Sequence, residues 1–109
     1  MRQAEIYRNG TLAGILSEEN RQHFVFLYDE KYFADKEKPA VSLTLPKTQQ
    51  EYQSEFLFPF FSNMLSEGAN REMQSRMLHI DEKDDFGILL ATAQYDTMGA
   101  ITVKPLYAK

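Results

Sequence analysis

Residues 4–16 read AEIYRNGTLAGIL, and this stretch decides how the fold begins. Asn9-Gly10 at its centre is the strongest short-range signal for a two-residue β-hairpin, because both central positions of a type I′ turn need positive φ. Ile6 is expected to share a strand face with Ala4 before the turn. The apolar positions expected to share a face after the turn are Leu12, Gly14 and Leu16. The stretch therefore predicts two antiparallel strands joined by a tight turn.

Three further strands are predicted, at residues 23–28, 40–46 and 100–104. The first is rich in aromatic and β-forming residues, and the second alternates Val41, Leu43 and Leu45 with hydroxyl side chains. The third ends at Pro105, because proline cannot donate to a strand ladder. The charged residues 29–38 are expected to form a solvated loop, and residues 47–53 a polar connector.

Two short helices are predicted next. Apolar residues recur at helical spacing over residues 57–65, with Pro59 in the first turn and Gly68 as the left-handed residue after the helix. Asn70 is the expected N-cap of the second helix. The residues that mark one face of this second helix are Met73, Met77 and Ile80.

A third short helix is predicted over residues 86–92, capped by Asp84 or Asp85. Strands and helices are largely segregated along the chain, an order typical of the α+β class. We therefore predict a single α+β domain over residues 1–109. Its mostly antiparallel sheet consists of the N-terminal hairpin plus further strands, with three short helices before a final strand.

The composition excludes several classes of function. The 109 residues include no cysteine, which rules out a disulfide scaffold, a thiolate metal site and a thiol nucleophile. Twelve basic and 16 acidic residues give a net charge of −4, which disfavours direct binding to nucleic acid. Neither a leader peptide nor an apolar segment of membrane-spanning length is recognisable, so no membrane association and a cytoplasmic location are expected.

No catalytic, metal or cofactor site is predicted. Asp85-Phe86-Gly87 spells the magnesium motif of protein kinases, but the sequence lacks the Gly-rich loop, the phosphate-binding lysine and the catalytic loop that accompany it. Residues 81–85 are acidic but fail the EF-hand pattern, and His23 and His79 are too few for a metal site. We expect a protein that is not an enzyme.

The aromatic run at residues 56–61 has two interpretations. A helix packed on a sheet buries two or three such rings in the core. The apolar residues of this run point in nearly every direction around a helix, however, and a thin two-layer domain rarely covers a helix on all sides. The flank formed by Phe56 and Phe58 is therefore a candidate surface for a partner protein, because interface cores are enriched in aromatic residues.

Several short motifs follow one another in order over nearly the whole chain: Tyr7–Gly14, Ser42–Pro46, Ser54–Phe61, Glu67-Gly68, Asp85–Ala91 and Gly99–Val103. In this order they resemble the N-terminal subdomain of HipA-type toxin kinases. The chain departs from that family at Ser66-Glu67-Gly68, where the family often has Pro-Glu-Gly. It also has Ala69 where stand-alone relatives carry a bulky aromatic residue.

The resemblance implies a function that is exerted on a partner. In HipA-type toxins the subdomain continues into a Ser/Thr kinase core. In HipBST systems it is a separate antitoxin, HipS, which neutralises the kinase, while a helix-turn-helix protein of the same operon binds DNA. The resemblance therefore implies a HipS-like antitoxin whose partners are a HipA-like kinase chain and such a DNA-binding protein. The alternative is a split, non-catalytic subunit needed for the kinase to fold or act.

The predicted kinase-binding site is the turn between the first two predicted helices: Ser66, Glu67, Gly68, Ala69, Asn70 and Arg71. Such a turn is expected to be exposed, because its backbone polar groups need water or a partner. Arg71 can make bidentate contacts to carboxylates, and its charge near a helix start is slightly unfavourable, which favours a use elsewhere. The Phe56–Phe58 flank is the second predicted surface.

Overall fold

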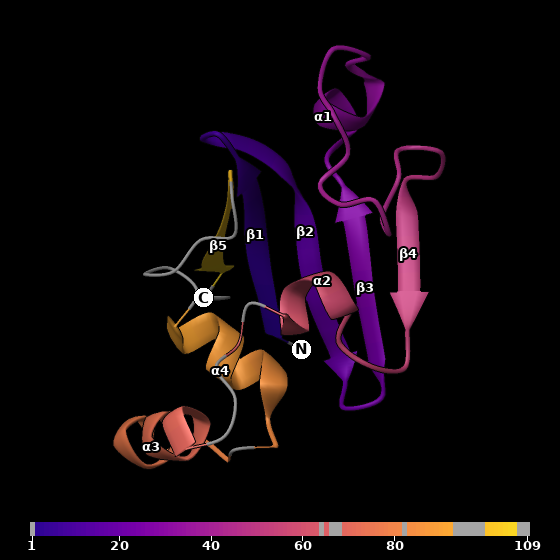
Figure 1. The fold of residues 1–109 in the computed structure, drawn as a ribbon. Helices are drawn as coiled ribbons and strands as arrows, with labels where there is room; N and C mark the ends of the chain where they lie inside the picture. The colour runs from indigo at the N-terminus through magenta and orange to yellow at the C-terminus, as the bar shows by residue number, and fades with distance from the viewer. Residues whose placement is uncertain (1, 64, 66–68, 82, 93–99, 107–109) are drawn as a thin grey trace.

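The computed structural model describes residues 2–63, 65, 69–81, 83–92 and 100–106. Within these residues, one antiparallel sheet has the strand order β4-β3-β2-β1-β5 (Figure 1). Its strands are β1 (Arg2–Arg8), β2 (Thr11–Asn20), β3 (His23–Tyr28), β4 (Glu51–Ser54) and β5 (Ile101–Leu106). The helices are α1 (Glu30–Ala34), α2 (Pro59–Ser62), α3 (Ala69–Leu78) and α4 (Asp85–Thr92). The predicted α+β class is confirmed.

The N-terminal hairpin forms as predicted. Asn9 and Gly10 join β1 to β2 with φ angles of 49° and 80°, the left-handed values that a two-residue hairpin turn needs. The pairing of β1 with β2 shifts between Ile6 and Tyr7, as in a β-bulge. Because of this shift, Ala13 is buried and Leu12 is only half-buried, which corrects the predicted alternation after the turn.

The hydrophobic core lies on the sheet face that α2 and α4 cover (Figure 1). Phe61 of α2 meets Phe26 of β3 with ring centroids 5.9 Å apart, and Phe86 of α4 meets Phe24 of β3 at 6.1 Å. Burial of such a ring stabilises a fold by roughly 1.5–3 kcal/mol. These aromatic pairs therefore hold both helices on β3.

Helix α2 is shorter than the predicted helix over residues 57–65. Pro59 is its first residue, as expected, and Phe58 before it is extended, with ψ of 135°. A residue that precedes proline is driven away from the helical region, so Leu57 and Phe58 stay outside the helix. Leu57, Phe58 and Phe61 are all buried, which supports the core interpretation for this part of the aromatic run.

Helices α3 and α4 meet the predictions to different degrees. Asp84 caps α4, since its Oδ1 accepts a hydrogen bond of 3.1 Å from the Gly87 amide. Helix α3 begins at Ala69, so Asn70 lies inside its first turn and is not its N-cap; Gly68 falls outside the described residues. Of the three residues predicted to mark one face of this helix, Met73 and Met77 are exposed, and Ile80, which is partly buried against the core, lies beyond the end of α3. No helix in the described part of the chain is long and apolar enough to span a membrane.

The predictions for residues 29–54 are largely wrong. Residues 40–46 form turns and bends in place of a strand, and the fourth strand, β4, lies at the end of the predicted connector. The predicted loop contains α1, whose Tyr32 is buried and whose N-terminus is capped by Asp29. The charged and polar residues of this segment gave no indication that Tyr32 is buried or that β4 forms an edge strand of the sheet.

A tyrosine-held loop, residues 35–47, replaces the predicted strand. The Tyr28 hydroxyl accepts a hydrogen bond of 2.9 Å from the Val41 amide and donates one to the carbonyl of Leu45. Val41 and Leu45 are therefore drawn into the core, whereas Leu43 between them is 100% exposed. In a strand, the two-residue period would place Leu43 on the same face as Val41 and Leu45, so its full exposure is incompatible with a strand here.

Strand β5 continues through Pro105, where the sequence predicted its end. Pro105 pairs with Ala4, and β5 is an edge strand bonded to β1 alone within the described sheet. On an edge strand the nitrogen of proline can face away from the sheet, where a donor is not needed. The edge position thus explains why proline is tolerated.

Candidate partner-binding site

The predicted turn lies mostly beyond the part of the chain that the structure describes. Residues 66–68 are outside the described residues, and residues 69–71 are described only as backbone in the first turn of α3. A kinase contact at this turn therefore stays a prediction.

The two rings of the second predicted surface lie in different environments. Phe58 is 7% exposed and packs against Phe61, with centroids 6.5 Å apart, so it is a core residue. Phe56 is 75% exposed, although it is a large apolar side chain. Of this pair, Phe56 is the ring that a partner can reach.

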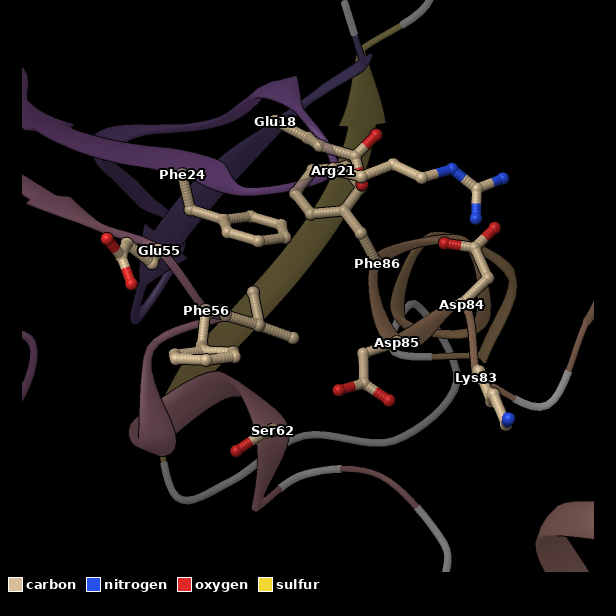
Figure 2. A pocket seen from close by; sticks show the side chains of 11 residues that line it. Glu18, Arg21, Phe24, Glu55, Phe56, Ser62, Lys83, Asp84, Asp85 and Phe86 are labelled. Atoms are coloured by element: carbon tan, nitrogen blue, oxygen red, sulfur yellow. The ribbon is translucent and has the colours of Figure 1, made fainter.

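Phe56 lies at the rim of a cavity of about 390 Å³, here called the Phe56 pocket (Figure 2). Segments that are distant in the sequence build it: the β2–β3 hairpin, residues 55–57 before α2, and the start of α4. Its apolar lining consists of Phe24, Phe56, Leu57 and Phe86. Its charged lining consists of Glu18, Arg21, Glu55, Lys83, Asp84 and Asp85. The pocket thus combines an aromatic floor with a charged rim.

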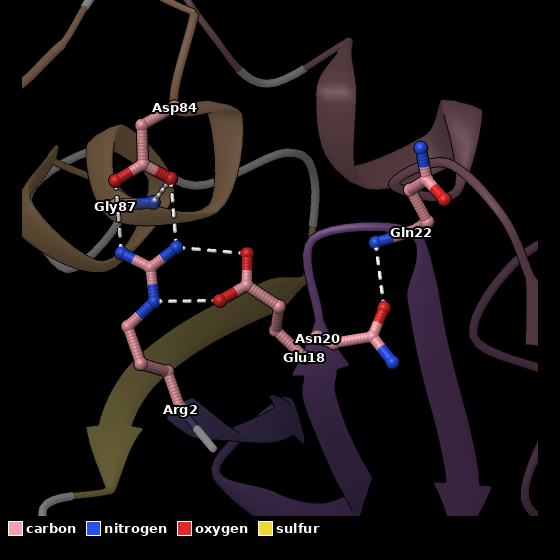
Figure 3. A network of polar contacts seen from close by, with 6 residues as sticks. All are labelled: Arg2, Glu18, Asn20, Gln22, Asp84 and Gly87. Carbon is pink, nitrogen blue, oxygen red and sulfur yellow. Dashed lines mark hydrogen bonds and ion pairs between the residues drawn. The ribbon is translucent and has the colours of Figure 1, made fainter.

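An ion-pair network borders this pocket. It consists of Arg2, Glu18 and Asp84 and is here called the Arg2 network (Figure 3). The guanidinium of Arg2 donates two hydrogen bonds of 2.8 Å to Glu18 and bonds of 2.9 and 2.7 Å to Asp84. Its Cζ atom also lies 5.4 Å from the centroid of the Phe86 ring. One arginine of β1 therefore joins β2 to the start of α4 by bidentate pairing and a cation–π contact.

Asp84 has a double role in this network. The Arg2 guanidinium beside it lowers the pKa of the Asp84 carboxyl, and the same carboxylate accepts the Gly87 amide. A Cβ atom at position 87 would lie 2.3 Å from Asp84 Oδ2 and 2.9 Å from Arg2 Nη1. The Asp-Phe-Gly tripeptide that follows Asp84 therefore starts a helix: Phe86 packs in the core, and Gly87 leaves room for the ion pair.

Sequence reasoning missed both the Arg2 network and most of the pocket. Arg2 and Asp84 are 82 positions apart, and neither belongs to a local motif apart from the Asp84 cap. Glu18 stands in a stretch that reads as a polar turn. The available signal was the pairing of β1 with β2, which brings Arg2 opposite Glu18 once the hairpin register is known.

The five-stranded sheet, the helices on one face and the surface pocket define a small α+β domain. The chain belongs to the HipA N-terminal domain family, whose model matches residues 4–104. This family assignment agrees with the resemblance carried by the sequence motifs.

Individual relatives fall into two sizes. The chain is 29% identical, over 95% of its length and 92% of the relative's, to an uncharacterised protein of Haemophilus influenzae. It is 25% identical over 96% of its own length to a protein of Sinorhizobium fredii named "Putative kinase Y4mE", of which it spans 25%. A solved structure described as the N-terminal domain of HipA toxin matches with a TM-score of 0.71 and 25% identity, covering 100% of this chain and 96% of that one.

Proposed function

We propose that this chain is a HipS-like antitoxin that binds a separately encoded, HipA-like Ser/Thr kinase in the cytoplasm and neutralises it. The observation that carries the proposal is the difference in length between two proteins that are similar to this chain. The same domain makes up a quarter of a protein named as a kinase and nearly the whole of the Haemophilus influenzae protein. A domain that occurs in both settings is suited to complement a kinase core as a separate chain.

The site chemistry supports binding in preference to catalysis. The one kinase-like tripeptide, Asp85-Phe86-Gly87, lies at the start of α4, where Phe86 is a core residue and the Gly87 amide is bonded to Asp84. The family assignment is to the N-terminal domain and not to a kinase core. A non-enzymatic protein acting through its surface fits both facts.

Co-expression with a HipA-like kinase encoded beside this chain tests the proposal. Growth is measured with the kinase alone, with the kinase and this chain, and with the kinase and the Ile6→Asp variant. Ile6 is fully buried, so this variant controls for an unfolded chain. Restored growth with the natural chain only, together with its co-purification with the kinase, is the expected result. Failure to bind the kinase would refute the proposal.

The same experiment tests the alternative function. The match to part of a kinase-length protein favours a split subunit that the kinase needs in order to fold or act. In that case the kinase alone is harmless, and adding this chain makes it toxic. A helix-turn-helix protein of the same operon is proposed as the DNA-binding third component, and its presence in the purified complex tests that part.

A further inference from the structure

Leu43 stands at the tip of the tyrosine-held loop, where the fold does not need an apolar side chain. The Leu45 amide donates a hydrogen bond of 3.1 Å to the Ser42 carbonyl, which closes a turn with Leu43 and Thr44 at its centre. Central turn positions usually carry Gly, Pro, Asn, Asp or Ser, which set the backbone or bond to it. A leucine side chain does neither, and Leu43 is the most exposed large apolar residue in the described part of the chain.

The loop holds Leu43 in a fixed position. The Tyr28 hydroxyl bonds the backbone two residues before Leu43 and two residues after it. The Ser42 hydroxyl oxygen accepts a hydrogen bond of 3.2 Å from the Thr44 amide, and the two hydroxyl oxygens lie 3.0 Å apart. A segment that is already ordered loses little conformational entropy when it binds. The tip of the loop is therefore preorganised for a contact.

An apolar hollow of about 390 Å³ adjoins Leu43. Its lining includes Val41 from the same loop, Phe60 from α2 and Ile101 from β5, and Arg8 is the one charged residue among the described residues that line it. The cores of protein interfaces are depleted of charged residues in the same way. Leu43 and this hollow thus form a continuous apolar surface, which differs from the Phe56 pocket with its charged rim.

The lengths of the two relatives indicate what covers this surface. The domain makes up a quarter of the protein named as a putative kinase, so the rest of that chain is available to pack against it. It makes up nearly the whole of the Haemophilus influenzae protein, where a separate chain would have to supply the cover. Leu43 is open in the described part of this chain, which leaves it free for a separate kinase.

We propose that Leu43 is an anchor residue, which inserts into an apolar pocket on the HipA-like kinase while the kinase surface around that pocket covers the adjoining hollow. A few fully desolvated side chains usually dominate the affinity of an interface, and a preorganised apolar tip is suited to be one of them. The inference rests on the proposed function, since it names the contact through which this chain recognises the kinase.

An NMR experiment tests whether the kinase covers Leu43 in the natural chain. The leucine methyl signals are followed with a soluble gadolinium chelate, which broadens the signals of exposed groups. In the free chain Leu43 is expected to broaden most, and buried Leu45 is the internal control. Adding the kinase is expected to protect Leu43, and unchanged broadening in the complex would overturn the proposal. If raising the concentration of this chain alone protects Leu43, a second copy is the occupant and the proposal is wrong.

Calorimetry against the kinase tests how much the anchor contributes. Leu43→Ala is expected to weaken binding at least ~10-fold, while Leu43→Met, which keeps an apolar side chain of similar volume, should stay within ~3-fold of the natural chain. Met77→Ala is the matched control. It shortens an exposed apolar side chain on α3, which lies far from the loop in Figure 1, and is expected to bind normally.

The outcomes separate the anchor from the proposed function. If the natural chain binds the kinase and Leu43→Ala binds equally well, Leu43 is not an anchor and the proposed function survives. A loss in Met77→Ala as large as that in Leu43→Ala also overturns the anchor, because exposed apolar area in general would then drive binding. If the natural chain does not bind the kinase, the proposed function fails and the anchor fails with it.

Discussion

At one end of the β2–β3 hairpin, here called the charged end, the Arg2 network links α4 to the sheet through ion pairs. At the other end, here called the neutral end, tyrosine hydroxyls bond residues 35–47 to the sheet. In the first, Arg2 satisfies two carboxylates at once. In the second, Tyr28 bonds Val41 and Leu45, and Tyr32 bonds the carbonyl of Pro39 at 2.7 Å. The charged end is partly exposed and lies beside the Phe56 pocket, whereas the neutral end is buried.

This difference makes the two ends respond to opposite changes of pH. Arg2 lowers the pKa of Asp84, so the folded state favours the ionised carboxylate and loses that stabilisation in acid. Burial raises the pKa of the Tyr28 hydroxyl to about 12, so the folded state favours the neutral phenol. The stabilisation from Tyr28 is complete below the ordinary tyrosine pKa of about 10 and is lost as the pH rises through about 12.

The largest effect is expected at the neutral end. Tyr28→Phe leaves the Val41 amide and the Leu45 carbonyl without their partner, and two buried groups left in this way are expected to cost about 2–4 kcal/mol of unfolding free energy. Urea denaturation measures the loss. Tyr52→Phe is the matched control, because its hydroxyl bonds the Pro46 carbonyl at an exposed position and is expected to cost under ~1 kcal/mol. Equal losses in both variants would mean that burial of the bond does not matter.

Gly87→Ala comes next and tests how tightly the charged end is packed. The added methyl group would meet the Asp84 carboxylate and the Arg2 guanidinium, and such overpacking is expected to cost about 1–3 kcal/mol. Thermal or urea unfolding measures it. In the double variant Asp84→Ala/Gly87→Ala the clash is relieved, so the combined loss should be smaller than the sum of the single losses. If the losses of unfolding free energy in the two single variants simply add in the double variant, the methyl group does not clash with Asp84, and Gly87 is needed only for its backbone conformation.

Asp84→Asn removes the charge and keeps a side chain that can still cap α4. At pH 7 the variant is expected to be less stable than the natural chain by about 1 kcal/mol, because the ion pair is partly exposed. The natural chain loses this advantage as the pH falls through the lowered pKa of Asp84, which lies below the ordinary value of 3.8, so the difference between the two unfolding free energies should shrink in that acidic range. A difference that stays constant with pH would assign the effect to the cap alone.

The same comparison shows what the sequence could predict. The Asn9-Gly10 turn and the position of Pro59 were predicted correctly, and Asp84 is one of the two residues predicted as the cap of α4. Each depends on neighbouring residues and on backbone preferences that tertiary contacts did not override. Residues 40–46 were misread as a strand because the side chain that shapes them, Tyr28, comes from β3. Local alternation carries no information about a distant hydroxyl group.

The candidate site was harder to predict for a related reason. Phe56 could be singled out because one helix cannot bury an aromatic run on all sides, but Phe58 could not be told apart from it without the extended backbone before Pro59. The carboxylates around the pocket come from β2, from the segment before α2 and from the start of α4. Their convergence depends on the packing of Phe86 on Phe24, which no single segment reveals.

Leu43→Ala is expected to have the smallest effect and gives the sharpest test of the tyrosine-held loop. Leu43 is 100% exposed between two buried neighbours, so its removal should change the unfolding free energy by less than ~0.5 kcal/mol. Leu45→Ala, two positions away, removes a buried side chain and is expected to cost about 2–5 kcal/mol. Both values come from the same urea titrations. If the two leucine variants lose similar stability, residues 40–46 alternate as a strand with Leu43 and Leu45 on one face, and the bonds from Tyr28 do not set the path of the loop.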